Sequence, residues 1–133
     1  MTSAKQLEGK VAIVTGAGAG IGRASALLFA KEGASAVCVD RDGPAVHELV
    51  NEFAGIGAKS IAMEADVSNA EDVERVVSET FRRFGRVDIL FNVAGIVPHG
   101  KIHEVRESDW DRAMEVNVKS VYLFSREIGR AHV

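Results

Sequence analysis

The chain has 133 residues, 47% hydrophobic and 26% charged, which predicts one globular domain and excludes a disordered or collagen-like protein. Its only cysteine, Cys38, excludes a disulfide framework and a cysteine-rich metal site, and the net charge of −3 argues against a nucleic-acid partner. The first ten residues are polar and no apolar run approaches the ~20 residues that cross a bilayer, so we expect a cytoplasmic protein with no metal site and no membrane partner.

Short apolar runs alternate with amphipathic stretches along the whole chain. The runs are β-branched, as in buried strands, and the stretches between them carry apolar residues at helical spacing. In chain order we expect strand 10–15, helix 20–32, strand 35–40, a helix capped by Asp42, strand 59–64, a helix capped by Ser68 and Glu71 and ended by Gly85, strand 87–92, and a helix opened by Ser108 and Asp111.

This alternation predicts an α/β fold in which one parallel sheet carries helices on both faces. The expected strand order is 3-2-1-4, which is half of a doubly wound fold. Ligands of such sheets bind beyond the carboxyl ends of the strands where the order reverses, here between the first and fourth strands. We therefore expect a site close to Thr15, Asp40, Glu64 and Asn92.

A glycine-rich loop follows the first strand, with the sequence Thr15-Gly16-Ala17-Gly18-Ala19-Gly20-Ile21-Gly22. Gly16 permits a tight turn, Gly20 permits close approach of a diphosphate, and Gly22 lets the helix lie against the sheet. The start of the helix, with Ala19 and Ile21, offers the anion unpaired N–H groups and a positive dipole end. The alternative is a flexible Gly-Ala turn, but the acid that ends the second strand favours a dinucleotide site.

That acid is Asp40, whose carboxylate can accept hydrogen bonds from both adenosine ribose hydroxyls. It would repel a 2′-phosphate, which typically costs several kcal/mol, so NAD is the expected cofactor, although Arg41 beside it could partly neutralise such a phosphate. After the third strand, Asp66 can accept from the adenine amine while Val67 packs on the ring. The alternative is that Asp66 only begins the turn into the next helix.

Two asparagines complete the candidate residues. Asn92 ends the fourth strand, where its amide can brace the glycine loop, and the small residues Ala94 and Gly95 leave room for a cofactor. The alternative there is an ordinary turn. Asn117 lies in an apolar helical stripe, so its amide must find a partner. That stripe contains Met114, Val118 and Val121.

These residues resemble the short-chain dehydrogenase/reductase family over about residues 5–127. The TGxxxGxG motif of that family corresponds to residues 15–22, and its NNAG motif to residues 92–95 with Val93 in place of the second asparagine. Its adenine-side Asp-Val pair corresponds to residues 66–67. The resemblance implies a Rossmann-type sheet and an NAD-dependent oxidoreductase that moves hydride between nicotinamide and a secondary alcohol or ketone. The complete enzyme would be a homotetramer.

The resemblance also implies roles for two residues of the last helix. Asn117 would help to hold a water in the catalytic proton relay, and Val116 would lie near the nicotinamide. A finer resemblance, which includes His99, is to a branch with cytosolic-type 3-hydroxybutyrate and 2-keto-3-deoxy-L-fuconate dehydrogenases. It implies a small hydroxy or sugar acid as substrate. His99 would then contact the substrate carboxylate, or it is an ordinary solvated loop residue.

The family's catalytic serine and Tyr-x-x-x-Lys pair have no counterpart here, and we expect them beyond the end of the chain. The only tyrosine, Tyr122, is followed four positions later by Arg126 and lies one element too early, so we expect it to pack. The chain alone would be inactive. The alternatives are a catalytically empty NAD-binding module and a methyltransferase.

The end of the chain also carries an expectation. Gly129 interrupts the helical pattern, and residues 128–133 (IGRAHV) resemble a translated sequencing adapter, so we expect the native part of this incomplete domain to be residues 1–127. We also expect an unpaired edge on the fourth strand, exposed apolar residues on the last helix and poor solubility.

Overall fold

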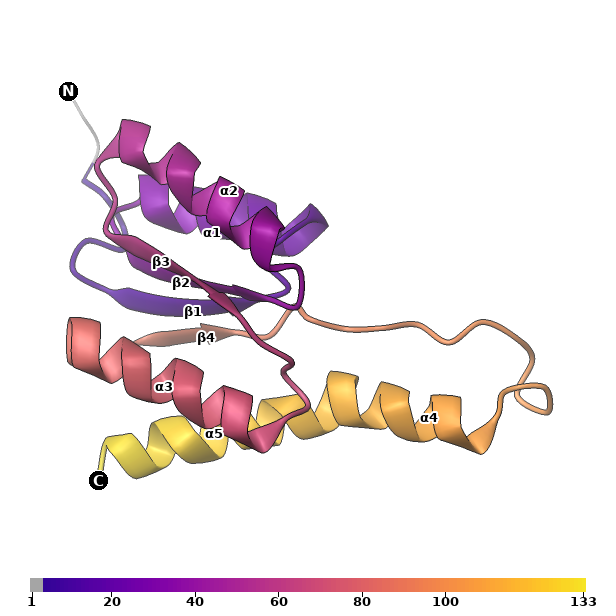
Figure 1. The fold of residues 1–133 in the computed structure, drawn as a ribbon. Helices are drawn as coiled ribbons and strands as arrows, with labels where there is room; N and C mark the ends of the chain where they lie inside the picture. The colour runs from indigo at the N-terminus through magenta and orange to yellow at the C-terminus, as the bar shows by residue number, and fades with distance from the viewer. Residues whose placement is uncertain (1–3) are drawn as a thin grey trace.

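The computed structural model describes residues 4–133, so residues 1–3 of the expected domain lie outside it. All pairings in its single four-stranded sheet are parallel and the strand order is β3-β2-β1-β4, which confirms the predicted α/β fold and strand order (Figure 1). The strands are β1 (Val11–Thr15), β2 (Ser35–Asp40), β3 (Ser60–Glu64) and β4 (Ile89–Phe91).

Helices cover both faces of the sheet (Figure 1). One face carries α1 (Gly20–Lys31) and α2 (Gly43–Phe53), and the other carries α3 (Ala70–Phe84) and α5 (Ser120–Ala131). A short 3-10 turn, η1 (Ala54–Ile56), follows α2. Helix α4 (Glu107–Met114) continues into α5 through one π-helical segment, η2 (Glu115–Lys119), and α4 with the loop before it extends past the edge of the sheet.

The strands supply alternate side chains to two cores, as their period of two requires. Ile13 and Val37 pack toward α3 and α5, whereas Val14 and Cys38 pack toward α1 and α2. Burial raises the pKa of the Cys38 thiol to about 12, so this side chain stays protonated and packs as an apolar residue. The two cores hold the sheet rigidly, and this fixes where the strands end.

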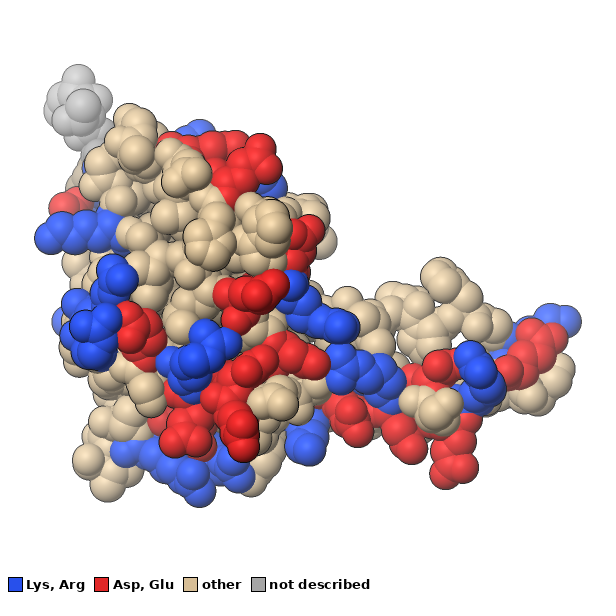
Figure 2. Space-filling model, viewed as in Figure 1, with Lys and Arg blue, Asp and Glu red and all other residues tan. Residues whose placement is uncertain are grey.

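The outer surface of α3 is covered by paired charges, and Figure 2 shows Lys and Arg beside Asp and Glu there and along α4. The Glu79 carboxylate accepts hydrogen bonds from Arg82 at 2.5 Å and Arg83 at 3.1 Å. These contacts, Arg82 first, lower the pKa of Glu79 to about 2. The spacing is three and four residues, at which side chains of one helix face meet.

Two helix starts differ from the prediction. Helix α3 begins at Ala70 and its N-cap is Asn69, whose side chain accepts from the Asp72 N–H at 3.0 Å. Asparagine caps a helix as well as serine does, and Ser68 instead donates its hydroxyl to Asp66 at 2.6 Å. The predicted capping box of Ser68 and Glu71 is therefore wrong.

The second difference concerns α4, which begins at Glu107 after Arg106 with no side-chain cap. The predicted opening by Ser108 and Asp111 is wrong, because both residues already lie inside the helix. Acidic residues in the first turn, Glu107 and Asp109, complement the positive end of the helix dipole.

Strand β4 is shorter than predicted, and its N-terminal side is held by a carboxylate. The Val11 N–H donates to Asp88 Oδ2 at 2.8 Å, and the Asp88 N–H donates to the Val11 carbonyl at 2.8 Å. Among the strands of residues 4–133, only β1 pairs with β4, so its other edge is open.

Helix α5 continues through Gly129 to Ala131. The prediction that this glycine interrupts the helix is therefore wrong. Arg130 donates to Glu127 at 3.0 Å, and Ile128 packs against the core shared by α3 and α5. The His132 ring packs edge-on against Phe81 with centroids 5.0 Å apart. The expected end of the native domain after residue 127 stays a prediction.

Candidate functional site

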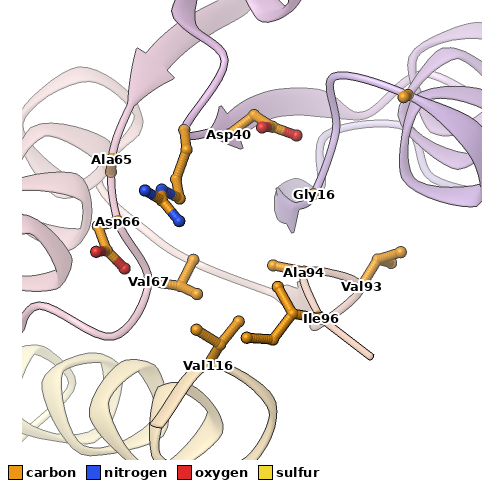
Figure 3. Close-up of a pocket in the computed structure, with 12 residues that line it drawn as sticks. Gly16, Asp40, Ala65, Asp66, Val67, Val93, Ala94, Ile96 and Val116 are labelled. Carbon is orange, nitrogen blue, oxygen red and sulfur yellow. The ribbon is translucent and has the colours of Figure 1, made fainter. Parts of the chain in front are cut away.

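A pocket of about 350 Å³ opens at the carboxyl ends of the strands, where the strand order reverses (Figure 3). It contains many of the residues predicted for cofactor binding, together with Ala65, Val93 and Ile96, which the sequence did not single out. The residues that line it are Gly16, Ala19, Asp40, Arg41, Ala65, Asp66, Val67, Val93, Ala94, Gly95, Ile96 and Val116.

The glycines of the loop have distinct reasons for lacking a side chain. Gly16 has φ +66°, and a Cβ there would lie 2.8 Å from the Ala94 nitrogen. A Cβ on Gly22 would collide with the carbonyl oxygen of Gly16. Gly20 has φ +56° and only open space within 4 Å of its Cβ position, so the chain presents bare backbone at the start of α1. This is the backbone shape that a bound diphosphate requires.

Asp40 ends β2 and lies over the glycine loop. Its Oδ2 accepts from the Gly18 N–H at 2.9 Å, and its Oδ1 accepts from the Asp42 N–H at 2.9 Å. An ionised carboxylate offers about four acceptor positions, so each oxygen retains one for a ligand. Arg41 lines the same pocket.

Thr15 joins the glycine loop to the end of β4, a role that the sequence pattern predicts for Asn92 instead. Its side chain is buried, and its Oγ1 accepts from the N–H groups of Val93 and Ala94, each at 3.1 Å. Asn92, expected to brace the loop, is exposed and does not line the pocket. Thr15 performs this task because β1 and β4 are neighbours, and a threonine directly before Gly16 is the sequence signal for it.

Asp66 and Val67 follow β3, as Figure 3 shows. Asp66 Oδ1 accepts from both the N–H and the hydroxyl of Ser68, at 2.9 and 2.6 Å, and Oδ2 accepts from Arg112 at 3.2 Å. Partial burial opposes ionisation of Asp66, but these bonds outweigh it and lower its pKa. Val67 is buried and forms an apolar wall.

Asn117 and Val116 lie in the π-helical segment η2. Asn117 Oδ1 accepts from the Ile96 N–H and its Nδ2 donates to the Ile96 carbonyl, both at 2.8 Å. The predicted partner of this amide is therefore the backbone of the loop after β4. Asn117 does not line the pocket, whereas Val116 and Ile96 do. Gly20, Ile21 and Gly22 also lie outside the pocket lining, at the start of α1.

The part of the chain that the structure describes contains no helix long and apolar enough to cross a membrane. Within residues 4–133 there is also no group of three or more His, Cys, Asp or Glu side chains placed to hold a metal ion. The residues that line the pocket supply backbone N–H groups, the carboxylates of Asp40 and Asp66, the guanidinium of Arg41 and apolar side chains.

Known proteins match this chain in sequence and in structure. An uncharacterized oxidoreductase of Thermotoga maritima is 43% identical over 119 residues, which cover 90% of this chain and 47% of that protein. A short chain dehydrogenase/reductase from Burkholderia phymatum in complex with NAD superposes with a TM-score of 0.90 at 36% identity, covering 95% of this chain and 45% of the other. A 3-ketoacyl-(acyl-carrier-protein) reductase from Brucella melitensis complexed with NADH has a TM-score of 0.85 at 42% identity, covering 92% and 50%.

The chain thus spans about half the length of the curated relatives it matches. The sequence profile described as short chain dehydrogenase matches residues 10–132. With this match over nearly the whole chain, the protein belongs to the short chain dehydrogenase family.

Proposed function

We propose that this chain binds NAD(H) and forms the cofactor part of an oxidoreductase site. The observation that carries the proposal is the pairing of the bare backbone at Gly20 with the Asp40 carboxylate, which Gly18 holds at 2.9 Å and which retains free acceptor positions. Two similar structures, from Burkholderia phymatum and Brucella melitensis, are complexes with NAD and NADH. This supports the same cofactor here.

In this proposal the diphosphate lies at the start of α1, where Ala19, Gly20, Ile21 and Gly22 present N–H groups and the positive end of the helix dipole. Asp40 accepts from the two hydroxyls of the adenosine ribose. The adenine lies against Val67, with its amine toward Asp66. The nicotinamide end extends toward Ala94, Gly95 and Val116.

NAD is favoured over NADP because a 2′-phosphate would lie against the Asp40 carboxylate, where like charges typically cost several kcal/mol. Arg41 lines the same pocket and offsets part of this repulsion. The preference is therefore expected to be strong but not absolute.

The proposed reaction is hydride transfer between the nicotinamide and a secondary alcohol or ketone carbon. Tyr122 is 57% exposed on α5 and its hydroxyl contacts Arg126 at 3.1 Å, away from the pocket, so it is not the acid or base. We propose that this chain alone does not turn over substrate, and that the proton-transfer groups lie in sequence outside it. Asn117 keeps one Nδ2 hydrogen beyond its bond to Ile96, which supports its proposed part in the proton relay.

Several finer points of the proposal rest on the sequence resemblance. They are a small hydroxy or sugar acid as substrate, a homotetrameric complete enzyme and a cytoplasmic location. The second candidate is a catalytically empty NAD-binding module, which would have the same pocket. Turnover by a complete enzyme that contains this segment would exclude that candidate.

Calorimetric titration of the wild-type chain and two variants with NADH and NADPH, and of the wild-type chain with S-adenosylmethionine, tests the proposal. NADH should bind the wild-type chain, and NADPH should bind at least about 10-fold more weakly. Asp40→Ala should weaken NADH binding about 10-fold and reduce the preference for NADH over NADPH. Glu48→Ala, which removes an exposed acid of α2, should change neither the affinity for NADH nor this preference. No heat with NADH on a folded sample, heat with S-adenosylmethionine instead, or no effect of Asp40→Ala would contradict the proposal.

A further inference from the structure

Arg112 connects two walls of the pocket without lining it. Its Nη1 donates to Ser68 Oγ at 2.5 Å, and its Nη2 donates to Asp66 Oδ2 at 3.2 Å. Arg112 lies on α4, one helical turn before Val116, which forms the opposite side of the pocket. Ser68 and Asp66 belong to the turn after β3, more than 40 residues earlier in the chain.

This contact joins α4 to the turn after β3. Helix α4 extends past the edge of the sheet (Figure 1). Among the hydrogen bonds of residues 4–133, those of Arg112 are the only ones that join an α4 side chain to the turn at residues 65–68. Val67 and Val116, which line the pocket, also belong to one buried apolar core, and Arg112 adds a polar contact beside that packing.

The three side chains form a closed set of hydrogen bonds. The Ser68 hydroxyl accepts from Arg112 and donates to Asp66 Oδ1, while Arg112 also bonds Asp66 Oδ2. With the Ser68 N–H, three of the roughly four acceptor positions of Asp66 are filled. One position remains, on the oxygen that Arg112 orients. A planar guanidinium can hold two such acceptors at once, whereas an ammonium acts as a point charge.

We propose that Arg112 is a positioning residue for adenine recognition, because it turns the one free acceptor of Asp66 toward the exocyclic amine of the base. This inference rests on the proposed NAD site. The bonds that fill Asp66 also lower its pKa, so at neutral pH the carboxylate is ionised and can accept hydrogen bonds but not donate them. The base that fits is one with an amine at this position, and a base with a carbonyl oxygen there would face the carboxylate with a second acceptor.

The experiment measures competition of AMP and IMP against NADH, because these nucleotides differ at the base atom that Asp66 faces. The wild-type chain should prefer AMP by about 10-fold. Arg112→Ala should weaken AMP about 10-fold and IMP by less than about 2-fold, so that the preference disappears. Arg106→Ala is the matched control. Within residues 4–133 this exposed arginine pairs only with Asp109, in the first turn of α4, so its removal should preserve the preference for AMP.

Two further variants keep the test decisive if Arg112→Ala unfolds. Arg112→Lys keeps the positive charge but can keep at most one of the two contacts, to Ser68 or to Asp66. It should therefore restore part of the preference for AMP over IMP. In an Asp66→Asn background, Arg112→Lys should change AMP affinity by less than about 2-fold, because Arg112 acts through Asp66. A merely structural role would weaken AMP and IMP equally.

The outcomes separate the two proposals. If the wild-type chain binds NADH and every Arg112 variant retains the AMP preference, the positioning role is wrong and the NAD site stands. If a folded wild-type chain binds neither NADH nor AMP, the proposed function is wrong and this inference falls with it.

Discussion

The two sides of helix α5 differ in how their apolar residues are covered. On the inner side, Leu123 is 2% exposed and Phe124 is 0% exposed, packed against α3 and the sheet. The outer side continues from η2, where Val118 is 54% exposed, and on α5 itself Tyr122 is 57% exposed. The inner side therefore stabilises the fold, whereas the outer side is an apolar surface with no cover among residues 4–133. The sequence predicts exposed apolar residues on this last helical stretch, which Val118 confirms, but the prediction that Tyr122 packs is wrong.

The strongest test of this comparison removes one aromatic ring from each side. Phe124→Ala should lower the free energy of unfolding by about 3–5 kcal/mol, because the ring leaves a cavity in a packed core. Tyr122→Ala should change it by less than about 0.5 kcal/mol. Urea denaturation followed by circular dichroism measures both. Equal losses would show that the outer side is covered in solution.

A second test compares a glycine in the site with one on α5. Gly22→Ala should destabilise the fold by about 1–3 kcal/mol, as overpacking does, and should weaken NADH binding, because its Cβ would collide with the Gly16 carbonyl. Gly129→Ala has open space around its Cβ and should stabilise α5 by about 0.5–1 kcal/mol. Thermal denaturation of both variants shows whether each substitution raises or lowers the stability of the fold. Equal losses of stability in the two variants would argue against this packing of the glycine loop.

A third test concerns the connection between β1 and the loop after β4. Thr15→Val removes the acceptor of two backbone N–H groups and should cost about 1–3 kcal/mol. Thr80→Val is the matched control, since the buried Thr80 hydroxyl only donates to Val76 within α3 and its loss should cost less. Hydrogen exchange at Val93 and Ala94 should accelerate in the Thr15 variant alone. Unchanged exchange there would contradict the assignment.

The last test concerns Asp88, which joins the start of β4 to β1. Partial burial opposes its ionisation, but hydrogen bonds from Arg86 and from the Val11 N–H outweigh it and lower its pKa. Because the pKa in the folded state lies below that in the unfolded state, about 3.9, its stabilisation is present above pH ~4 and is lost as the pH falls through the folded value. Asp88→Asn should therefore cost about 1 kcal/mol at pH 7 and less at pH 3, which lies below the unfolded pKa. Urea denaturation of the wild type and the variant at both pH values measures the free energy of unfolding. An equal loss at the two pH values would contradict this role of the Asp88 carboxylate.

Local patterns predicted much of this molecule. The strand order, the glycine loop and the Asp42 cap follow from alternating apolar runs, glycine spacing and capping preferences, and all of these signals lie within a few residues. The cap of α3 was missed because Ser68 and Asn69 are both good caps, and the choice depends on a contact with Asp66.

Contacts between distant segments could not be predicted in this way. Thr15 meets Val93 across 78 positions, Arg112 meets Ser68 across 44, and Asn117 meets Ile96 across 21. Each depends on which segments the fold places side by side. Asn92 was assigned a bracing task because it ends a strand, but its neighbour Val93 makes the contact, through its backbone.

The most direct test is a titration of the ¹⁵N-labelled chain with NADH, followed by the amide resonances. We expect saturable shifts at the glycine loop, at Asp40 and Arg41, and at residues 65–67. The exposed residues Val118 of η2 and Val121 and Tyr122 of α5 should be unmoved. Asp40→Ala should reduce the shifts at the same concentration of NADH. An unshifted glycine loop in a folded sample, or shifts confined to α5, would contradict a cofactor site at this edge of the sheet.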